Sequence, residues 1–245
     1  MELLQGLTTT RSVRLRLDLE RPVPAEVVGR CLQLALQAPT GGHAEDWRWV
    51  LVGDRELKRR IGEIYLRNYE EQVLAPLRGR AGTSDRQVAG RLGGVEADGR
   101  PSRRTERILA GADHLARNLG AVPWLVLACA TRPSPDRGGA GTVSAVFGSI
   151  YPAVWSFNLA LRAQGLGTTI TSLTLHSTDE MNALLGIPDD AVHVCLLPVA
   201  YTVGTDFKVA ARRPVREVAF LDRWGTPFPY DDVPLDQLAA EEEAP

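Results

Sequence analysis

The stretch VSAVFGSIYPAVWSFNLALRA, residues 143–163, decides the fold of this chain because it is long, apolar and nearly uncharged. A helix that is apolar on all sides is either the buried centre of a globular protein or oligomer, or a membrane span. Ser149, Pro152 and Asn158 interrupt the stretch, and neither a basic cluster nor an aromatic belt flanks it. We therefore predict a core helix, and no membrane partner.

The segments on either side of this helix have the patterns of other helices and of a few separated strands. Pro24 suits the first turn of a helix that ends before Ala38-Pro39. Ser177 and Glu180 have the spacing of a capping box at the start of a short helix that ends at Gly186. Long helices with few strands indicate an α+β domain. We predict strands at 47–52, 124–130 and 192–201, and further helices at about 54–72 and 105–118.

Composition describes an ordinary globular protein of 245 residues, with 44% hydrophobic and 24% charged residues. This length favours one domain over residues 1–245. The net charge of −2 argues against a nucleic-acid partner. Three widely spaced cysteines in apolar runs, with no basic and apolar leader at the N-terminus, indicate free thiols and a cytoplasmic protein without a metal site.

Residues 78–104 are the least core-like part of the chain, being rich in glycine and arginine. A loop of this length inside a domain is either a functional lid or disordered, and the residues themselves do not separate the two. From about residue 220 we expect a C-terminal extension.

Arg11-Ser12-Val13-Arg14 is the first candidate binding motif, because two guanidiniums and a hydroxyl suit a phosphate or a carboxylate. A second basic group, Arg212 and Arg213, follows the last predicted strand. No Gly-x-x-x-x-Gly-Lys-Ser/Thr loop, early Gly-x-Gly-x-x-Gly turn or Gly-x-Ser-x-Gly elbow occurs. His43, beside Glu45 and Asp46 in a glycine-rich turn, is either a pocket wall or part of a surface loop, whereas His193 is expected to be a hydrogen-bonded core or interface residue.

Five segments in order give the chain a resemblance to the FMN-dependent nitroreductase family. They cover roughly residues 8 to 225, and each one is a weak signal by itself. The segments are Arg11-Ser12-Val13-Arg14, Ala38-Pro39-Thr40-Gly41-Gly42 running to Trp47, Ala163-Gln164-Gly165-Leu166-Gly167-Thr168, Leu185-Gly186-Ile187-Pro188, and Arg212-Arg213-Pro214 with Glu217-Val218.

The resemblance implies an α/β sandwich with a central mixed or antiparallel sheet flanked by helices, assembled as an intertwined homodimer with FMN at the interface. In this family pattern Arg11, Ser12 and Arg14 contact the FMN phosphate, ribityl chain or pyrimidine edge. The other positions that the resemblance assigns to the cofactor are Arg212 and, less directly, Arg213 at the phosphate, Thr40 and Gly42 from the partner subunit, and Thr171 and Ser172 near the isoalloxazine ring.

The activity that the resemblance implies is oxidoreduction carried by the cofactor, with no catalytic residue required of the protein. NAD(P)H would reduce the flavin in a ping-pong cycle, and a nitroaromatic, quinone or activated alkene would reoxidise it. Dehydrogenation of a biosynthetic intermediate and flavin binding without turnover stay open as alternatives, and flavin fragmentation or reductive dehalogenation is a third. His43 and the Glu45-Asp46 pair depart from the residues usual in the family, so the substrate is open as well.

Overall fold

The computed structural model describes residues 1–78, 102–131 and 139–235. They fall into two compact units, Arg11–Thr205 and Met1–Thr10 with Asp206–Pro245, and each is described by itself. The predicted excursion at 78–104 lies almost entirely outside the described residues. The single domain over residues 1–245 stays a prediction.

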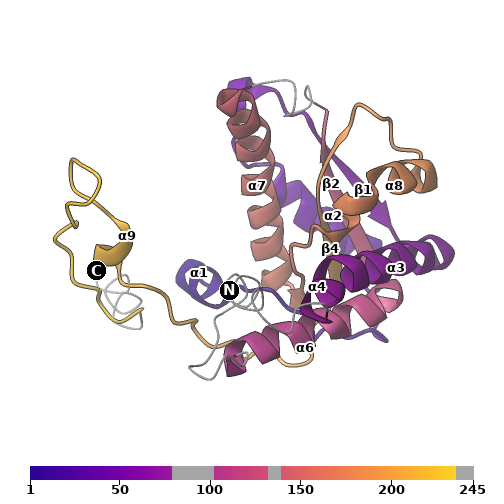
Figure 1. Ribbon diagram of the computed structural model, residues 1–245, viewed down its shortest axis with the longest axis horizontal. Coiled ribbons are helices and arrows are strands. Elements are labelled where there is room, and N and C mark those ends of the chain that lie inside the picture. Colours follow the sequence, from indigo (N-terminus) through magenta and orange to yellow (C-terminus); the bar gives the residue numbers. More distant parts are fainter. Residues whose placement is uncertain (79–101, 132–138, 236–245) are drawn as a thin grey trace. The chain divides into compact units, whose positions relative to one another are not determined.

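An antiparallel sheet forms the centre of the larger unit (Figure 1). Its four strands within the described residues lie in the order β1-β2-β4-β3. Each pairing is antiparallel. The resemblance implied a mixed or an antiparallel sheet, and the structure has an antiparallel one. The strands predicted at 47–52, 124–130 and 192–201 are confirmed. The bounds are β1 Trp47–Val52, β2 Trp124–Ala130, β3 Leu166–Gly167 and β4 Val192–Tyr201.

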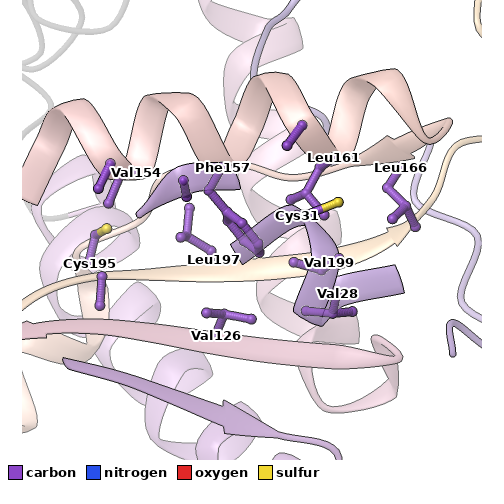
Figure 2. Packing of buried hydrophobic residues seen from close by; sticks show 14 of the residues in the cluster. Val28, Cys31, Val126, Val154, Phe157, Leu161, Leu166, Cys195, Leu197 and Val199 are labelled. Carbon is purple, nitrogen blue, oxygen red and sulfur yellow. The ribbon is translucent and has the colours of Figure 1, made fainter. Parts of the chain in front are cut away.

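The predicted core helix is α7 (Ala140–Ala163), which packs with α2 (Ala25–Ala35) on one face of the sheet. Phe157 and Leu161 of α7 have no exposed surface, and Figure 2 shows Phe157 above Leu197 and Leu161 above Val199 of β4. By length and composition alone α7 could also cross a bilayer. Its inner face instead completes the apolar core, because burial of these side chains is what stabilises the layer.

Helices α3 (Arg55–Tyr69) and α6 (Arg103–Asn118) supply a second set of buried side chains. Successive residues of a strand point to opposite faces, so Leu125 and Leu127 of β2 point away from the α7 layer, and both are fully buried. The other elements are the π-helical turn Glu70–Leu74 and α4 (Ala75–Arg78) after α3, the turn Leu119–Ala121 after α6, and the turn Leu173–Ser177 followed by α8 (Thr178–Leu185).

Glycines end two helices, and the one after α8 was predicted from the sequence. Gly165 and Gly186 adopt left-handed φ angles of 74° and 66° after α7 and α8, as C-terminal glycines do. The capping box at α8 was predicted wrongly, because the Ser177 side chain does not cap the helix. Its hydroxyl bonds instead to the Asn68 amide of α3, 3.1 Å from Oδ1. Ser177 therefore bonds to a side chain far away in the sequence instead of to the first turn of its own helix.

His193 on β4 is buried as predicted, but its expected hydrogen bonds are missing. Within the described residues neither ring nitrogen has a hydrogen-bond partner. Burial lowers the pKa of this imidazole below its ordinary value of 6.5, because the charged form loses its hydration. The ring therefore stays neutral in the fold at a pH where it would be protonated in the unfolded chain.

Acid should for this reason destabilise the protein through His193. Below about pH 6.5 the unfolded chain binds a proton that the folded chain does not, so the free energy of unfolding falls as the pH falls. The contribution is at most about 1.4 kcal/mol per pH unit. Urea unfolding at pH 7.5 and pH 5 should show a smaller loss for His193→Gln than for the wild type, with exposed His176→Gln as the control. Equal losses in all three proteins would contradict the assignment.

The smaller unit contains α1 (Leu3–Thr9), α9 (Val215–Val218) and part of the predicted C-terminal extension. Phe220 and Pro227 form an isolated antiparallel bridge, so the chain turns back on itself here. The Trp224 side chain is 90% exposed, and its ring centroid lies 4.8 Å from that of Phe220.

Candidate functional site

The Arg11–Arg14 segment is fixed in the larger unit through Val13. The Val13 amide donates to the Thr168 carbonyl at 2.8 Å, and the Val13 side chain is buried against Gly167. A Cβ added to Gly167 would lie 2.6 Å from the Thr202 side chain and 3.0 Å from Val13 Cβ, so only glycine fits this close approach. The buried valine thus holds the backbone from which Arg11, Ser12 and Arg14 extend.

Arg14 is the most enclosed of the three predicted cofactor residues in this segment. It is half-buried, whereas Arg11 and Ser12 are exposed. Its side chain passes Gly111 of α6, where an added Cβ would lie 3.7 Å from Arg14 Cδ. No carboxylate within the described residues forms an ion pair with this guanidinium. A half-buried guanidinium without a counter-charge favours an anionic ligand.

Thr171 bonds to Tyr65, and the charge of Arg14 acts on the same tyrosine. The Thr171 backbone pairs with Leu196 of β4 through N–O distances of 3.0 and 2.8 Å, and its Oγ1 lies 2.8 Å from the Tyr65 hydroxyl. Burial raises the pKa of Tyr65, and the positive charge of Arg14 opposes that rise. The structure therefore brings together two predicted stretches, Arg11–Arg14 and Thr171–Ser172.

Two further hydroxyls beside this contact have unused hydrogen-bonding capacity. Thr168 and Thr169 are buried, and their Oγ1 atoms have no hydrogen-bond partner within the described residues. Buried polar groups are almost always satisfied. Unsatisfied hydroxyls, a buried backbone anchor and a half-buried guanidinium at one place fit a polar, anionic cofactor.

The predicted turn residues Thr40 and Gly42 lie at another place, against α7. The Gly41 amide donates to Ser149 Oγ at 3.0 Å. Gly42, His43 and Glu45 have φ angles of 64°, 53° and 47°, and left-handed backbone in two residues other than glycine costs on the order of 1–3 kcal/mol each. Such strain is typical of functional turns.

His43 projects into solvent from this turn. Its side chain is 92% exposed, and Nε2 lies 3.5 Å from Glu45 Oε1. Within this unit His43 is a surface residue, which agrees with the surface loop that the sequence allowed as one of two interpretations. A part in a pocket stays a prediction that would need another element to cover the turn.

Arg212 and Arg213 belong to the smaller unit, where both are exposed. The Arg212 guanidinium donates to the neighbouring Ala211 carbonyl at 3.4 Å, its one hydrogen bond within the described residues. Their contact with a phosphate stays a prediction.

The Nitroreductase family model matches residues 7–201. The chain belongs to the nitroreductase family. The match covers most of the chain and includes Arg11–Arg14, Thr40–Gly42 and Thr171–Ser172, but it ends before Arg212.

Relatives of this nitroreductase-family chain include deiodinases. The iodotyrosine deiodinase of Daphnia pulex is 25% identical over 200 residues, which are 80% of this chain and 59% of that protein. The chain thus spans about three fifths of the length of this curated relative.

Solved structures share the fold of this nitroreductase-family chain. A crystal structure of oxidised iodotyrosine deiodinase bound to FMN and 3-iodo-L-tyrosine is 22% identical with a TM-score of 0.58, covering 91% of this chain and all of that one. A nitroreductase with bound FMN from Desulfitobacterium hafniense DCB-2 is 17% identical with a TM-score of 0.56, over 85% of this chain and 93% of that one.

Tyr65 and Asn68 are the residues of this site that the sequence interpretation missed. Both lie on the buried face of α3, where Asn68 Nδ2 donates to the Leu173 carbonyl at 2.9 Å and Tyr65 reaches Thr171. A signal was present, because two polar groups at helical spacing among Ile61 and Ile64 must find partners once buried. The sequence does not say where those partners lie.

Proposed function

We propose that this chain is an FMN-dependent oxidoreductase. The observation that carries the proposal is the half-buried Arg14 guanidinium, which packs against Gly111 and has no carboxylate partner among the described residues. When bound, FMN would supply the hydride and electron-transfer chemistry, and the protein would supply binding, orientation and charge.

Each predicted cofactor residue has a role in this proposal. Arg11 and Ser12, exposed on a fixed backbone, bind the phosphate or ribityl chain, and Arg212 with Arg213 adds positive charge at the phosphate. Arg14 sits at the pyrimidine edge, where a permanent positive charge stabilises the negative charge that the cofactor gains on reduction. Thr171 and Ser172 run along the isoalloxazine ring. Thr40 and Gly42 are contributed by a second subunit.

The second subunit in this proposal is another copy of the chain. The outer side of α7 exposes Tyr151 and Trp155 to 39% each, and the Tyr151 ring stacks near Phe147 with centroids 6.0 Å apart. An apolar outer face on a helix whose inner face is already core suits burial against a second copy. Light scattering of the purified protein should give the mass of a dimer, and a monomer would exclude this site architecture.

We propose NAD(P)H as the reductant and a nitroaromatic, quinone or activated alkene as the acceptor, in a ping-pong cycle. Oxidation of a biosynthetic intermediate and FMN binding without turnover are the alternatives. A second candidate activity, reductive dehalogenation of a halogenated phenol, is favoured by the similarity to iodotyrosine deiodinase over 80% of the chain. In all of these the protein binds FMN, so the cofactor can be tested before the substrate.

The purified protein should be yellow and should release FMN, rather than FAD, on denaturation. Colourless protein that cannot be reconstituted with FMN would refute the cofactor assignment. The loaded protein is then assayed for NADH and NADPH oxidation with menadione or nitrofurazone, and separately for iodide release from 3-iodotyrosine with dithionite as the reductant. Turnover in the first assay supports the main proposal, and turnover in the second alone supports dehalogenation. FMN-loaded protein inactive in both assays would leave two alternatives, oxidation of a biosynthetic intermediate and FMN binding without turnover.

A further inference from the structure

The contact between Tyr65 and Thr171 joins two elements that are 106 residues apart in the chain. Tyr65 is 3% exposed on α3. Thr171 is held by two backbone hydrogen bonds to Leu196 of β4. Both hydroxyls are therefore attached to fixed backbone, and neither can turn away without losing its partner.

The chemistry of the two hydroxyls decides which one donates. A phenol is a far stronger acid than an aliphatic alcohol, so the Tyr65 hydroxyl is the better donor and Thr171 Oγ1 the better acceptor. The nearby positive charge of Arg14 strengthens the phenol as a donor, since it stabilises electron density on the phenol oxygen. We therefore assign the phenol as the donor and Thr171 Oγ1 as the acceptor of this 2.8 Å contact.

This direction leaves the Thr171 hydrogen without an acceptor. Tyr65 is the one side chain within the described residues that bonds to Thr171 Oγ1. A hydroxyl that already accepts one bond has its remaining donor direction restricted. With the backbone fixed as well, the Thr171 O–H is a donor whose direction is restricted in advance.

We infer that Tyr65 is a positioning residue, which directs the Thr171 hydroxyl so that this hydroxyl and Arg14 together favour the reduced cofactor over the oxidised one. The inference rests on the proposed FMN site and adds a role that the family motifs do not assign. Fixed donors that need no reorganisation stabilise a developing negative charge more than mobile ones do. Losing the phenol hydroxyl should thus affect the reduced state more than the oxidised state.

Tyr65→Phe tests the inference in full-length, FMN-loaded protein. The variant should keep its affinity for oxidised FMN within about threefold, and its preference for the reduced form should fall by roughly three- to tenfold. By the relation of 29.6 mV per tenfold for a two-electron couple, the midpoint potential should fall by about 15–30 mV. The potential is measured against reference dyes, and the affinity by quenching of FMN fluorescence on binding to apoprotein.

Tyr69→Phe is the matched control, since Tyr69 is equally buried one turn further along α3. Its potential should stay at the wild-type value. In the Thr171→Val background, Tyr65→Phe should have no further effect, because Tyr65 acts through the Thr171 hydroxyl. Additive shifts would assign Tyr65 a separate role and overturn the inference.

Thr171→Val and Thr171→Ser keep the test valid should Tyr65→Phe fail to fold. Valine should lower the potential as Tyr65→Phe does, and serine, which keeps the hydroxyl, should restore it. Unchanged potentials in an FMN-loaded Thr171→Val protein would overturn the inference while leaving the proposed function intact. Wild-type protein that binds no FMN would instead refute the proposed function itself.

Discussion

Replacing Phe157 by alanine should lower the free energy of unfolding by about 3–5 kcal/mol, the usual cost of removing a buried phenyl ring. The ring has no exposed surface and lies where α7 meets α2, β2 and β4 (Figure 2). It also packs against the Trp49 ring, with centroids 5.8 Å apart. Because neighbours from four elements surround it, the cavity cannot collapse without moving the sheet. Urea unfolding followed by tryptophan fluorescence measures the loss.

Leu34→Ala is the control for this substitution. Leu34 lies on α2, which packs against α7, but its own side chain is 61% exposed. Its replacement should change the free energy of unfolding by no more than about 0.5 kcal/mol. A loss below about 1 kcal/mol for Phe157→Ala, or equal losses in the two variants, would mean that this cluster is not the centre of stability.

The core could be predicted from the sequence because its signals are local. The strands at 47–52 and 124–130 have the predicted bounds, since apolar residues dominate each run and polar or turn residues follow it. β3 was missed because Leu166–Gly167 is a strand only through its pairing with Tyr201 and Ala200. The Ser177 cap was predicted wrongly for the same kind of reason, since a partner on α3 takes its hydroxyl.

The candidate site shows the same division between local and long-range information. Arg11, Arg14 and Thr171 could be selected because their motifs occur in the family's order. Tyr65 could not, because its role depends on a contact across 106 residues. The left-handed backbone of His43 and Glu45 has no sequence signal either, since residues other than glycine rarely adopt it.

Arg14→Ala should weaken FMN binding by about 1.5–3 kcal/mol, or roughly 10- to 150-fold, as expected for loss of a hydrogen bond to a charged group. The guanidinium is half-buried with no carboxylate partner among the described residues. Its removal therefore breaks no ion pair among these residues. The substitution should lower the affinity for FMN and leave the stability of the fold unchanged. Titration of apoprotein with FMN, followed by flavin fluorescence, gives the dissociation constant, and thermal unfolding of the apoprotein checks stability.

Two further variants separate geometry from charge. Arg60→Ala removes the same charge from an exposed position on α3, and it should leave FMN affinity within about twofold, because salt screens exposed charges. Arg14→Lys keeps the charge but loses the planar fork of donors, so its affinity should fall between those of the wild type and Arg14→Ala. If Arg14→Ala binds FMN as tightly as Arg60→Ala does, this arginine does not contact the cofactor. The unpaired guanidinium would then need another anionic ligand.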